Sequence, residues 1–235
     1  MRANLTETRM NVSFAAPGIA ALAPELLHHY NPQVKGWGDL MRVREVAQRE
    51  GKMYEPGTEP IVFAGFDLDN SETGGGAYNI WPVIVVEACG NKLRLEITQA
   101  MRKIHLGARL EEGIVQWSDE TRRKTVELVK SQTADAVTAF LDIDFLAAQI
   151  APIEEKAGKE LEHPLEAVQA VSKELAYTQE QQDGILDHFL KGGQMTAGGV
   201  LNAVTSFAQT VESADEAYGL EAGALKALEV AYAAA

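Results

Sequence analysis

Cysteine is nearly absent from the sequence: Cys89 is the only one among 235 residues. A single cysteine excludes an internal disulfide and any zinc site built from several cysteines. No apolar run approaches the ~18 residues of a membrane-spanning helix. The first residues, MRANLTETRMNVSF, lack the continuous apolar core of a signal peptide. These absences predict a cytoplasmic protein that does not contact a membrane. Cys89 lies in the apolar stretch VIVVEACGN, which favours a buried structural thiol.

Sequence signatures of enzymes are also missing. The chain has no dinucleotide-binding fingerprint, no GxSxG nucleophile elbow and no GxxxxGK[ST] phosphate loop. Its five histidines form no HxxH or HxH pair, so no metal site is indicated. We therefore expect no catalytic residues, no metal and no cofactor, and we favour a non-catalytic protein over an enzyme.

Charge is unevenly distributed. The formal net charge is −13, and from Ser131 onward 5 Lys and Arg residues face 17 Asp and Glu residues, whereas the first 130 residues hold 16 against 17. This balance disfavours a strongly basic protein that coats DNA. Basic residues do gather locally, at Lys92, Arg94, Arg102, Lys103, His105, Arg109, Arg122, Arg123 and Lys124. They form either a solvated face or a ligand-binding surface.

The first half of the chain mixes helical and strand patterns. Helix formers at 17–30 and an apolar stripe at 38–52 predict two short helices. Residues 61–66 and 77–88 are rich in Val, Ile and aromatic residues and predict strands, with Pro82 indicating an edge or a bulge. Residues 92–98 alternate between apolar and charged side chains, which predicts a half-buried antiparallel strand. We expect a three-stranded meander over about residues 61–98.

From Ser118 the sequence is helical almost to its end. Apolar residues at helical spacing predict helices at 118–141, 163–177, 178–193, 196–212 and 213–234. Ser118 is a candidate N-cap, Pro164 suits a first helical turn, and Gly192-Gly193 is a stop signal. The predicted fold class is α+β: a small antiparallel sheet flanked by helices, followed by a helical C-terminal part. We expect the regions 1–117 and 118–235 to pack as one continuous domain.

The stretch DLDNSETGGG, residues 67–76, is the first candidate site. Asp67 and Asp69 are two residues apart, so on a strand both would project to one face and could hold a divalent metal. Glycines and the Asn-Ser pair equally suit a hairpin turn. Both interpretations stay open at this point. The residues that could contact a ligand are Asp67, Asp69, Asn70, Ser71, Glu72 and Gly74.

The basic segment is the second candidate, because phosphate contacts require only charge and reach. The residues that could contact nucleic acid are Arg94, Arg102, Lys103, His105 and Arg109. Three nearby aromatic residues, Tyr78, Trp81 and Trp117, could stack on bases.

Several segments together resemble a family of phage and plasmid proteins of unknown function: DNSETGGGAYNI, ACGN, RKIHLGARLEEGIVQWSDETRR and LNAVTSFAQT with ADEAYGLEAGALKALE. The family's Asn-Ser-Glu-x-Gly loop matches 70–74, its His-x-Gly segment matches 105–107, and its Asn-Ala-Val-Thr segment matches 202–205. Two features depart from the family: the cysteine segment reads Cys-Gly-Asn-Lys at 89–92, and many members have a longer N-terminal region. The resemblance implies a mobile-element protein that acts inside a bacterium.

Three functional hypotheses follow. The first is a non-catalytic protein that handles single-stranded nucleic acid as an oligomer and resembles phage single-strand annealing proteins. The second is a phage structural or host-interaction protein, such as an inhibitor of a host protein, that binds no nucleic acid. The third is an enzyme that uses a divalent metal at Asp67, Asp69 and Glu72.

Overall fold

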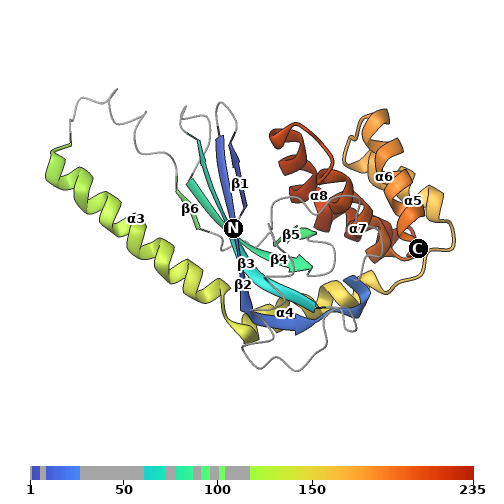
Figure 1. The fold of residues 1–235 in the computed structure, drawn as a ribbon, viewed down its shortest axis with the longest axis horizontal. Coiled ribbons are helices and arrows are strands. Elements are labelled where there is room, and N and C mark those ends of the chain that lie inside the picture. Colours follow the sequence, from blue (N-terminus) through green and yellow to red (C-terminus); the bar gives the residue numbers. More distant parts are fainter. Residues whose placement is uncertain are drawn as a thin grey trace.

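The computed structural model describes residues 2–5, 9–26, 61–71, 78–86, 91–95, 101–103 and 117–235. Its strands are β1 (Arg2–Leu5), β2 (Arg9–Leu22), β3 (Ile61–Ser71), β4 (Tyr78–Val86), β5 (Lys92–Arg94) and β6 (Met101–Lys103). Its helices are the 3-10 turn η1 (Pro24–Leu26), α3 (Asp119–Phe140), α4 (Ile143–Ala157), α5 (Pro164–Glu174), α6 (Gln179–Gly192), α7 (Ala197–Ala208) and α8 (Ala214–Ala233). The predicted α+β class and the helical C-terminal part are confirmed (Figure 1).

The described strands form one antiparallel sheet. Its order is β1-β2-β3-β4-β5, and β6 also pairs with β4. The predicted meander corresponds to β3, β4 and β5, and the two N-terminal strands extend it on one side. β5 pairs with residues 83–85 of β4, whereas β6 pairs with residues 78–80. Pro82, which has no N–H to donate, lies between the residues of β4 that pair with β6 and those that pair with β5. Because β4 has neighbours on both sides, the edge position that was one of its two predicted settings is wrong.

The helix predicted at 17–30 is wrong over the described residues 17–26, because β2 continues to Leu22 and is followed by η1. The β2–β3 register shifts between Ala16 and Ala20. Pro17 and Gly18 therefore lie within a bulge, where a residue that cannot donate to the ladder is tolerated. The helix predicted at 38–52 lies outside the described residues.

Strand β3 is longer than the sequence indicated. It includes Asp67, Asp69, Asn70 and Ser71, which we expected in a loop, because β2 pairs with it as far as Ser71. Asp69 pairs with Asn79 of β4, so the glycine-rich stretch joins two neighbouring antiparallel strands. This connection agrees with the hairpin interpretation of residues 67–76.

Local signals account for the helix ends. Ser118 caps α3 by accepting a hydrogen bond from the Thr121 N–H, as predicted. Thr178 and Gln181 form a reciprocal capping box at the start of α6, and Gly193 ends that helix in the left-handed conformation, with φ at 68°. The helices predicted over the regions of α3, α5, α6, α7 and α8 are confirmed.

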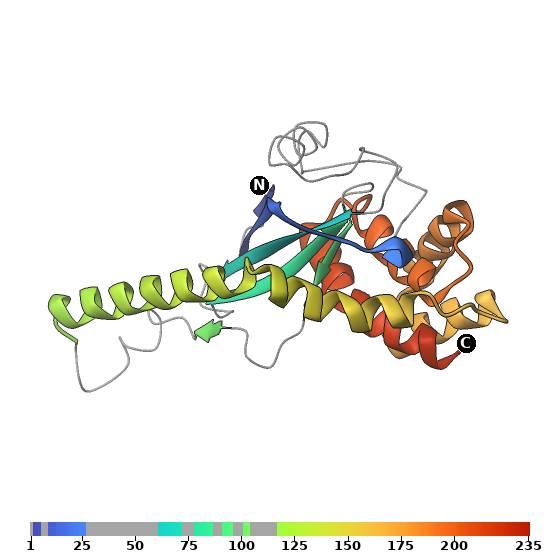
Figure 2. The same cartoon turned by 90° about the horizontal axis from the view of Figure 1, so that it is seen from below.

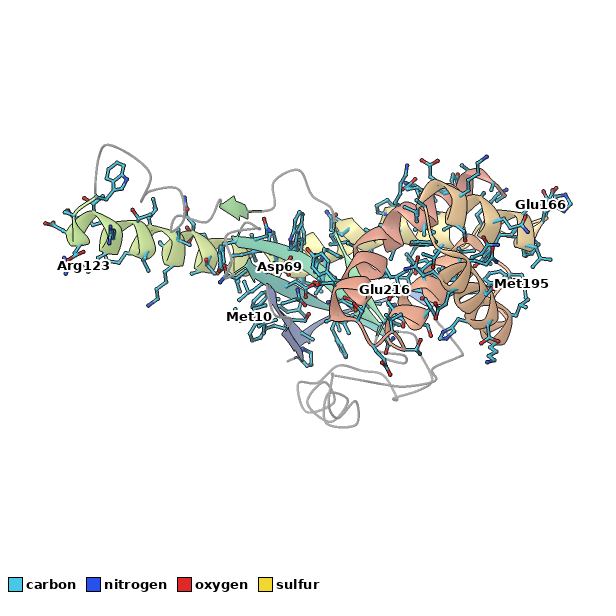
Figure 3. All side chains as sticks on the ribbon, turned by 90° about the horizontal axis from the view of Figure 1, so that it is seen from above. Met10, Asp69, Arg123, Glu166, Met195 and Glu216 are labelled. Atoms are coloured by element: carbon cyan, nitrogen blue, oxygen red, sulfur yellow. The ribbon has the colours of Figure 1, made fainter. Side chains whose placement is uncertain are left out.

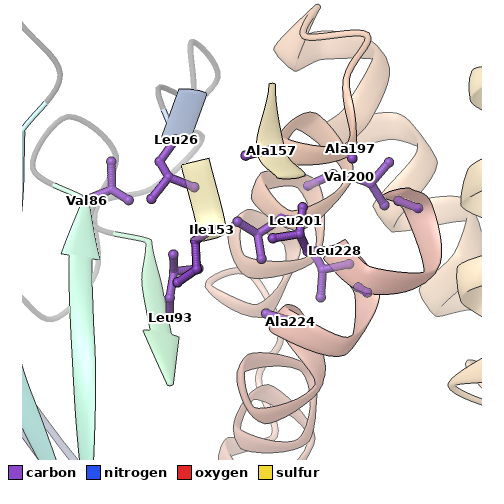
Figure 4. Packing of buried hydrophobic residues seen from close by; sticks show 14 of the residues in the cluster. Leu26, Val86, Leu93, Ile153, Ala157, Ala197, Val200, Leu201, Ala224 and Leu228 are labelled. Carbon is purple, nitrogen blue, oxygen red and sulfur yellow. The ribbon is translucent and has the colours of Figure 1, made fainter. Parts of the chain in front are cut away.

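The hydrophobic core joins the sheet to the C-terminal helices. Leu93 of β5 and Val86 of β4 belong to the same buried cluster as Ile153 of α4, Leu201 of α7 and Leu228 of α8 (Figure 4). Lys92 and Arg94 are buried as well. The half-buried strand predicted at 92–98 is therefore wrong over β5, because both of its faces are covered.

Helix α3 has a different environment from the other helices. It packs against β3, β4 and β6, but its N-terminal half projects beyond the sheet in both Figure 1 and Figure 2. Phe140, in its last turn, is its one fully buried residue. Within the described residues, no helix alone is long and apolar enough to cross a membrane, although α3 and α4, bent by 61° at their junction, reach that length and composition together.

Candidate functional site

Strand register gathers four polar residues on one face of the sheet. Ser13 of β2 lies opposite Asp67 of β3, and Asn11 lies opposite Asp69. Asn11 donates a hydrogen bond from Nδ2 to Asp69 Oδ1. All four side chains are at most 5% exposed. The predicted common face of Asp67 and Asp69 is confirmed, but this face is buried.

Two cations from β5 neutralise these carboxylates. The Arg94 guanidinium contacts Asp67 Oδ2 at 2.7 Å and Asp69 Oδ2 at 3.2 Å. Lys92 Nζ lies 3.1 Å from Asp67 Oδ2 and donates to Ser13 Oγ at 3.1 Å. Lys92 and Arg94, which the sequence placed on either a solvated face or a ligand-binding surface, therefore lie against the acidic face of β3.

Helix α8 closes the cluster. Glu221 Oε2 lies 2.7 Å from Lys92 Nζ. The Tyr218 hydroxyl donates to Asp69 Oδ2 at 2.8 Å, and its ring lies 4.0 Å from the Arg94 guanidinium carbon. Figure 3 shows Asp69 on the sheet close to α8. We call these residues the buried charge cluster: Asn11, Ser13, Asp67, Asp69, Lys92, Arg94, Tyr218 and Glu221.

The cluster keeps its groups charged in spite of burial. Burial alone would raise the pKa of Asp67, but Lys92 and Arg94, together with hydrogen bonds, hold that pKa below its usual value. Burial opposes the charge of Arg94 too, but Asp67 and Asp69 raise its pKa above the usual value. Because removing one partner of a buried ion pair leaves an uncompensated charge, each member depends on the others.

The cluster cannot serve as a nucleic-acid contact or an open metal site. Arg94 is 2% exposed, so its predicted contact with nucleic acid is wrong. The predicted ligand contacts of Asp67 and Asp69 are also wrong, because both carboxylates are buried and paired with cations. No group of three potential metal ligands occurs in the described part of the chain. The metal-enzyme hypothesis thereby loses two of its three residues.

The remaining predicted site residues are only partly visible. Asn70 is half-buried in β3, and Ser71 is the last residue of that strand. Arg102 and Lys103 belong to β6, although their side chains are not described. Four further predicted residues lie outside the described part of the chain: Glu72, Gly74, His105 and Arg109. Cys89 lies outside it as well.

A chain of buried amides links the sheet to α7. Asn91, just before β5, donates from Nδ2 to the carbonyl oxygen of Asn202 at 3.3 Å and accepts from Gln209 Nε2 at 2.6 Å. Asn202 donates in turn to Gln194 Oε1 at 3.1 Å, and Gln194 donates to the Glu25 carbonyl at 2.8 Å. Asn91 and Asn202 come from two of the segments that carry the family resemblance. These hydrogen bonds give Asn91 and Asn202 a structural role within the protein.

A serine and a histidine also meet inside the helical part. His188 Nδ1 of α6 lies 2.9 Å from Ser206 Oγ of α7. Both side chains are buried, and burial lowers the pKa of His188. Ser206 lies within a helix and is 1% exposed, so no substrate could reach its oxygen. The pair is a hydrogen bond between two packed helices, in agreement with the absence of a nucleophile signature.

Helix α3 carries exposed cations. One flank of the helix carries Arg122, Val126 and Lys130, which are spaced four residues apart. Arg123 lies on the same flank, because it is seven residues, or about two turns, from Lys130. We call Arg122, Arg123 and Lys130 the basic flank. All three are exposed, and Val126 between them is 67% exposed. Glu120 and Glu127 lie on the adjoining side, where Glu120 pairs with Lys124 at 2.8 Å and Glu127 pairs with Arg123 of the flank at 3.9 Å.

The basic flank begins about one helical turn from the sheet edge. Tyr78 Oη of β4 lies within hydrogen-bonding distance of Thr133 Oγ1 of α3, at 3.1 Å. Tyr78 in turn pairs with Lys103 of β6. This arrangement brings the backbone of β6 beside α3, so that the basic positions of strand and helix border one edge of the molecule. Figure 3 places Arg123 at the far end of that edge, remote from the cluster around Asp69.

Several residues of the buried cluster were not expected from the sequence: Asn11, Ser13, Lys92, Tyr218 and Glu221. One signal was available. Aspartates two residues apart in β3 and cations two residues apart in β5 have matching spacing, and each pair projects to one face of its strand, although β4 lies between the two strands. The contribution of α8 had no comparable signal, because Glu221 follows Lys92 by more than a hundred residues.

Comparisons with known protein families, curated proteins and solved structures found no match to this chain. The resemblance to phage and plasmid proteins therefore stays a prediction.

Proposed function

We propose that this protein binds single-stranded nucleic acid without catalysing a reaction, along the edge formed by β6 and α3. The observation that carries the proposal is the basic flank: three exposed cations on one side of a projecting helix. Exposed Arg and Lys side chains are free to contact phosphates, and each contact releases counterions that were condensed on the nucleic acid. Arg102 and Lys103 of β6 extend the same edge.

Charge separation supports this assignment. Residues from Ser131 onward, which include α4 to α8, have 5 basic against 17 acidic residues. A polyanion would be repelled by that part and would bind at the opposite end, where α3 begins. With the resemblance to mobile-element proteins, this arrangement suits a protein that acts on single strands during annealing or recombination in the cytoplasm of a bacterial host.

A host-interaction protein is the second candidate. The same acidic helices would suit a basic protein partner, and such a partner would contact α4 to α8 instead of α3. The two candidates thus place the ligand at opposite ends of the molecule.

We expect the wild-type protein to bind a labelled single-stranded oligonucleotide more tightly than the matching duplex, with an affinity that falls steeply between about 50 and 200 mM salt. The flank is a short row of cations on a helix, and a flexible strand can follow it more closely than a stiff duplex. Fluorescence anisotropy across a salt titration measures both properties. Absence of binding at low salt would contradict the proposal and favour the host-interaction candidate.

A further inference from the structure

The three aromatic residues that the sequence suggested for base stacking differ in their exposure. Tyr78 is half-buried, and its hydroxyl contacts Thr133 of α3. Trp81 is half-buried within β4, with the Arg94 guanidinium carbon 5.9 Å from its ring. Trp117 is 45% exposed. Two of the three candidates are therefore already occupied by contacts inside the protein.

Trp117 is also distinguished by its position. In the described part of the chain the exposed aromatic side chains are Trp117 and Tyr232. Tyr232 lies near the end of α8, within the acidic helical part. Trp117 directly precedes the N-cap of α3, and Arg122 and Arg123 follow within two helical turns. Trp117 is therefore an exposed aromatic ring that is close in sequence to two cations of the basic flank.

We propose that Trp117 stacks on a base of the bound strand while the basic flank holds its phosphates; this inference rests on the proposed function. Trp117 precedes the N-cap Ser118, and Arg122 and Arg123 lie about 4.5 and 6 Å beyond the first helical residue, Asp119, along the helix axis. The ring and the two cations are thus separated by a length of only a few phosphates, at the duplex spacing of about 3.4 Å per strand. One short strand could therefore meet the ring and both cations at the same time. Aromatic stacking accepts any base, so we expect little sequence preference.

Stacking and phosphate contacts have different experimental signatures. Phosphate contacts release counterions, so their loss flattens the dependence of affinity on salt. Stacking releases no counterions, so the loss of Trp117 lowers affinity equally at every salt concentration. The two kinds of residue can thus be separated in a single titration.

The test compares Trp117→Leu with wild-type protein on two probes: a fluorescein-labelled 15-nucleotide oligothymidylate and an abasic oligonucleotide of the same length. We expect Trp117→Leu to weaken oligothymidylate binding about 5- to 100-fold, to leave abasic binding within about twofold, and to keep the same salt slope. Trp117→Phe, which retains a ring, should recover most of the lost affinity. Leu128→Ala, which changes an exposed apolar residue within α3, is the matched control and should leave both affinities unchanged.

The outcomes separate the two proposals. If wild-type protein binds both probes and Trp117→Leu changes neither affinity, the stacking inference is wrong and the proposed function stands. Equal losses on both probes would likewise exclude stacking, since the abasic strand has no base to stack. If wild-type protein binds neither probe, the proposed function fails, and the inference fails with it.

Discussion

Replacing Lys92 by methionine is expected to lower the free energy of unfolding by about 3–5 kcal/mol. Lys92 Nζ lies 3.1 Å from Asp67 and 2.7 Å from Glu221, and all three side chains are almost fully buried. Methionine fills a similar volume but removes the ammonium group that neutralises the buried carboxylate of Glu221. A loss of this size is a large share of the 5–15 kcal/mol that typically stabilises a domain. Urea unfolding followed by circular dichroism measures it.

Lys124→Met is the matched control for Lys92→Met. Lys124 also pairs with a glutamate, Glu120 at 2.8 Å, but both side chains are largely exposed. Exposed pairs contribute little to stability, so we expect little change. If Lys92→Met does not fold, the double variant Lys92→Met with Glu221→Met tests the same point, because removing both charges should recover much of the lost stability. Equal, small effects of Lys92→Met and Lys124→Met would show that the cluster is not held by buried ion pairs.

Gly199→Ala is expected to destabilise the protein by about 1–3 kcal/mol or more, although alanine usually favours a helix by about 1 kcal/mol over glycine. A Cβ at Gly199, in the first turn of α7, would lie 1.8 Å from the carbonyl oxygen of Gln194. The backbone would have to move, and Gln194 would leave its contacts with Asn202 and Glu25. The buried amide chain between the sheet and α7 depends on that close approach.

Gly219→Ala is expected to have the opposite effect on stability. Gly219 lies in α8, and no atom lies within 4 Å of the position its Cβ would take. We expect this variant to be more stable than wild type by about 0.4–1 kcal/mol. Thermal unfolding of both variants gives the comparison. Stabilisation by both substitutions would mean that Gln194 does not pack against α7 as described.

The helical part could be predicted because its signals are local. Ser118, Pro164 and Gly193 mark helix ends within a few residues of the apolar stripes that they delimit. Strand β2 could not be predicted in the same way. Its partner β3 begins about forty residues later, and Pro17 and Gly18 interrupt its pattern at a bulge. The residues of a strand that depends on distant pairing carry only a weak signal of strand structure.

The buried charge cluster and the basic flank were predictable from the sequence to different degrees. Alternation within 92–98 predicts a charged face that includes Arg94, but the alternation does not say what covers that face. Tyr218 and Glu221 of α8 cover it, and nothing local to β5 indicates this. Arg122 and Arg123 are recognised as basic residues from the sequence, and their common flank with Lys130 follows from the helical spacing predicted for residues 118–141, which the structure confirms.

The decisive measurement is the salt dependence of single-strand binding for two triple variants of equal net charge. The first changes the basic flank: Arg122→Gln, Arg123→Gln and Lys130→Gln. The second changes three exposed lysines of the acidic helical part: Lys159→Gln, Lys173→Gln and Lys226→Gln. Each phosphate contact contributes about −0.7 to the slope of log affinity against log salt concentration for a single strand. The flank variant is expected to flatten that slope by up to about 2, and the control variant to leave it unchanged. Equal slopes for both variants and wild type would contradict binding of nucleic acid along α3.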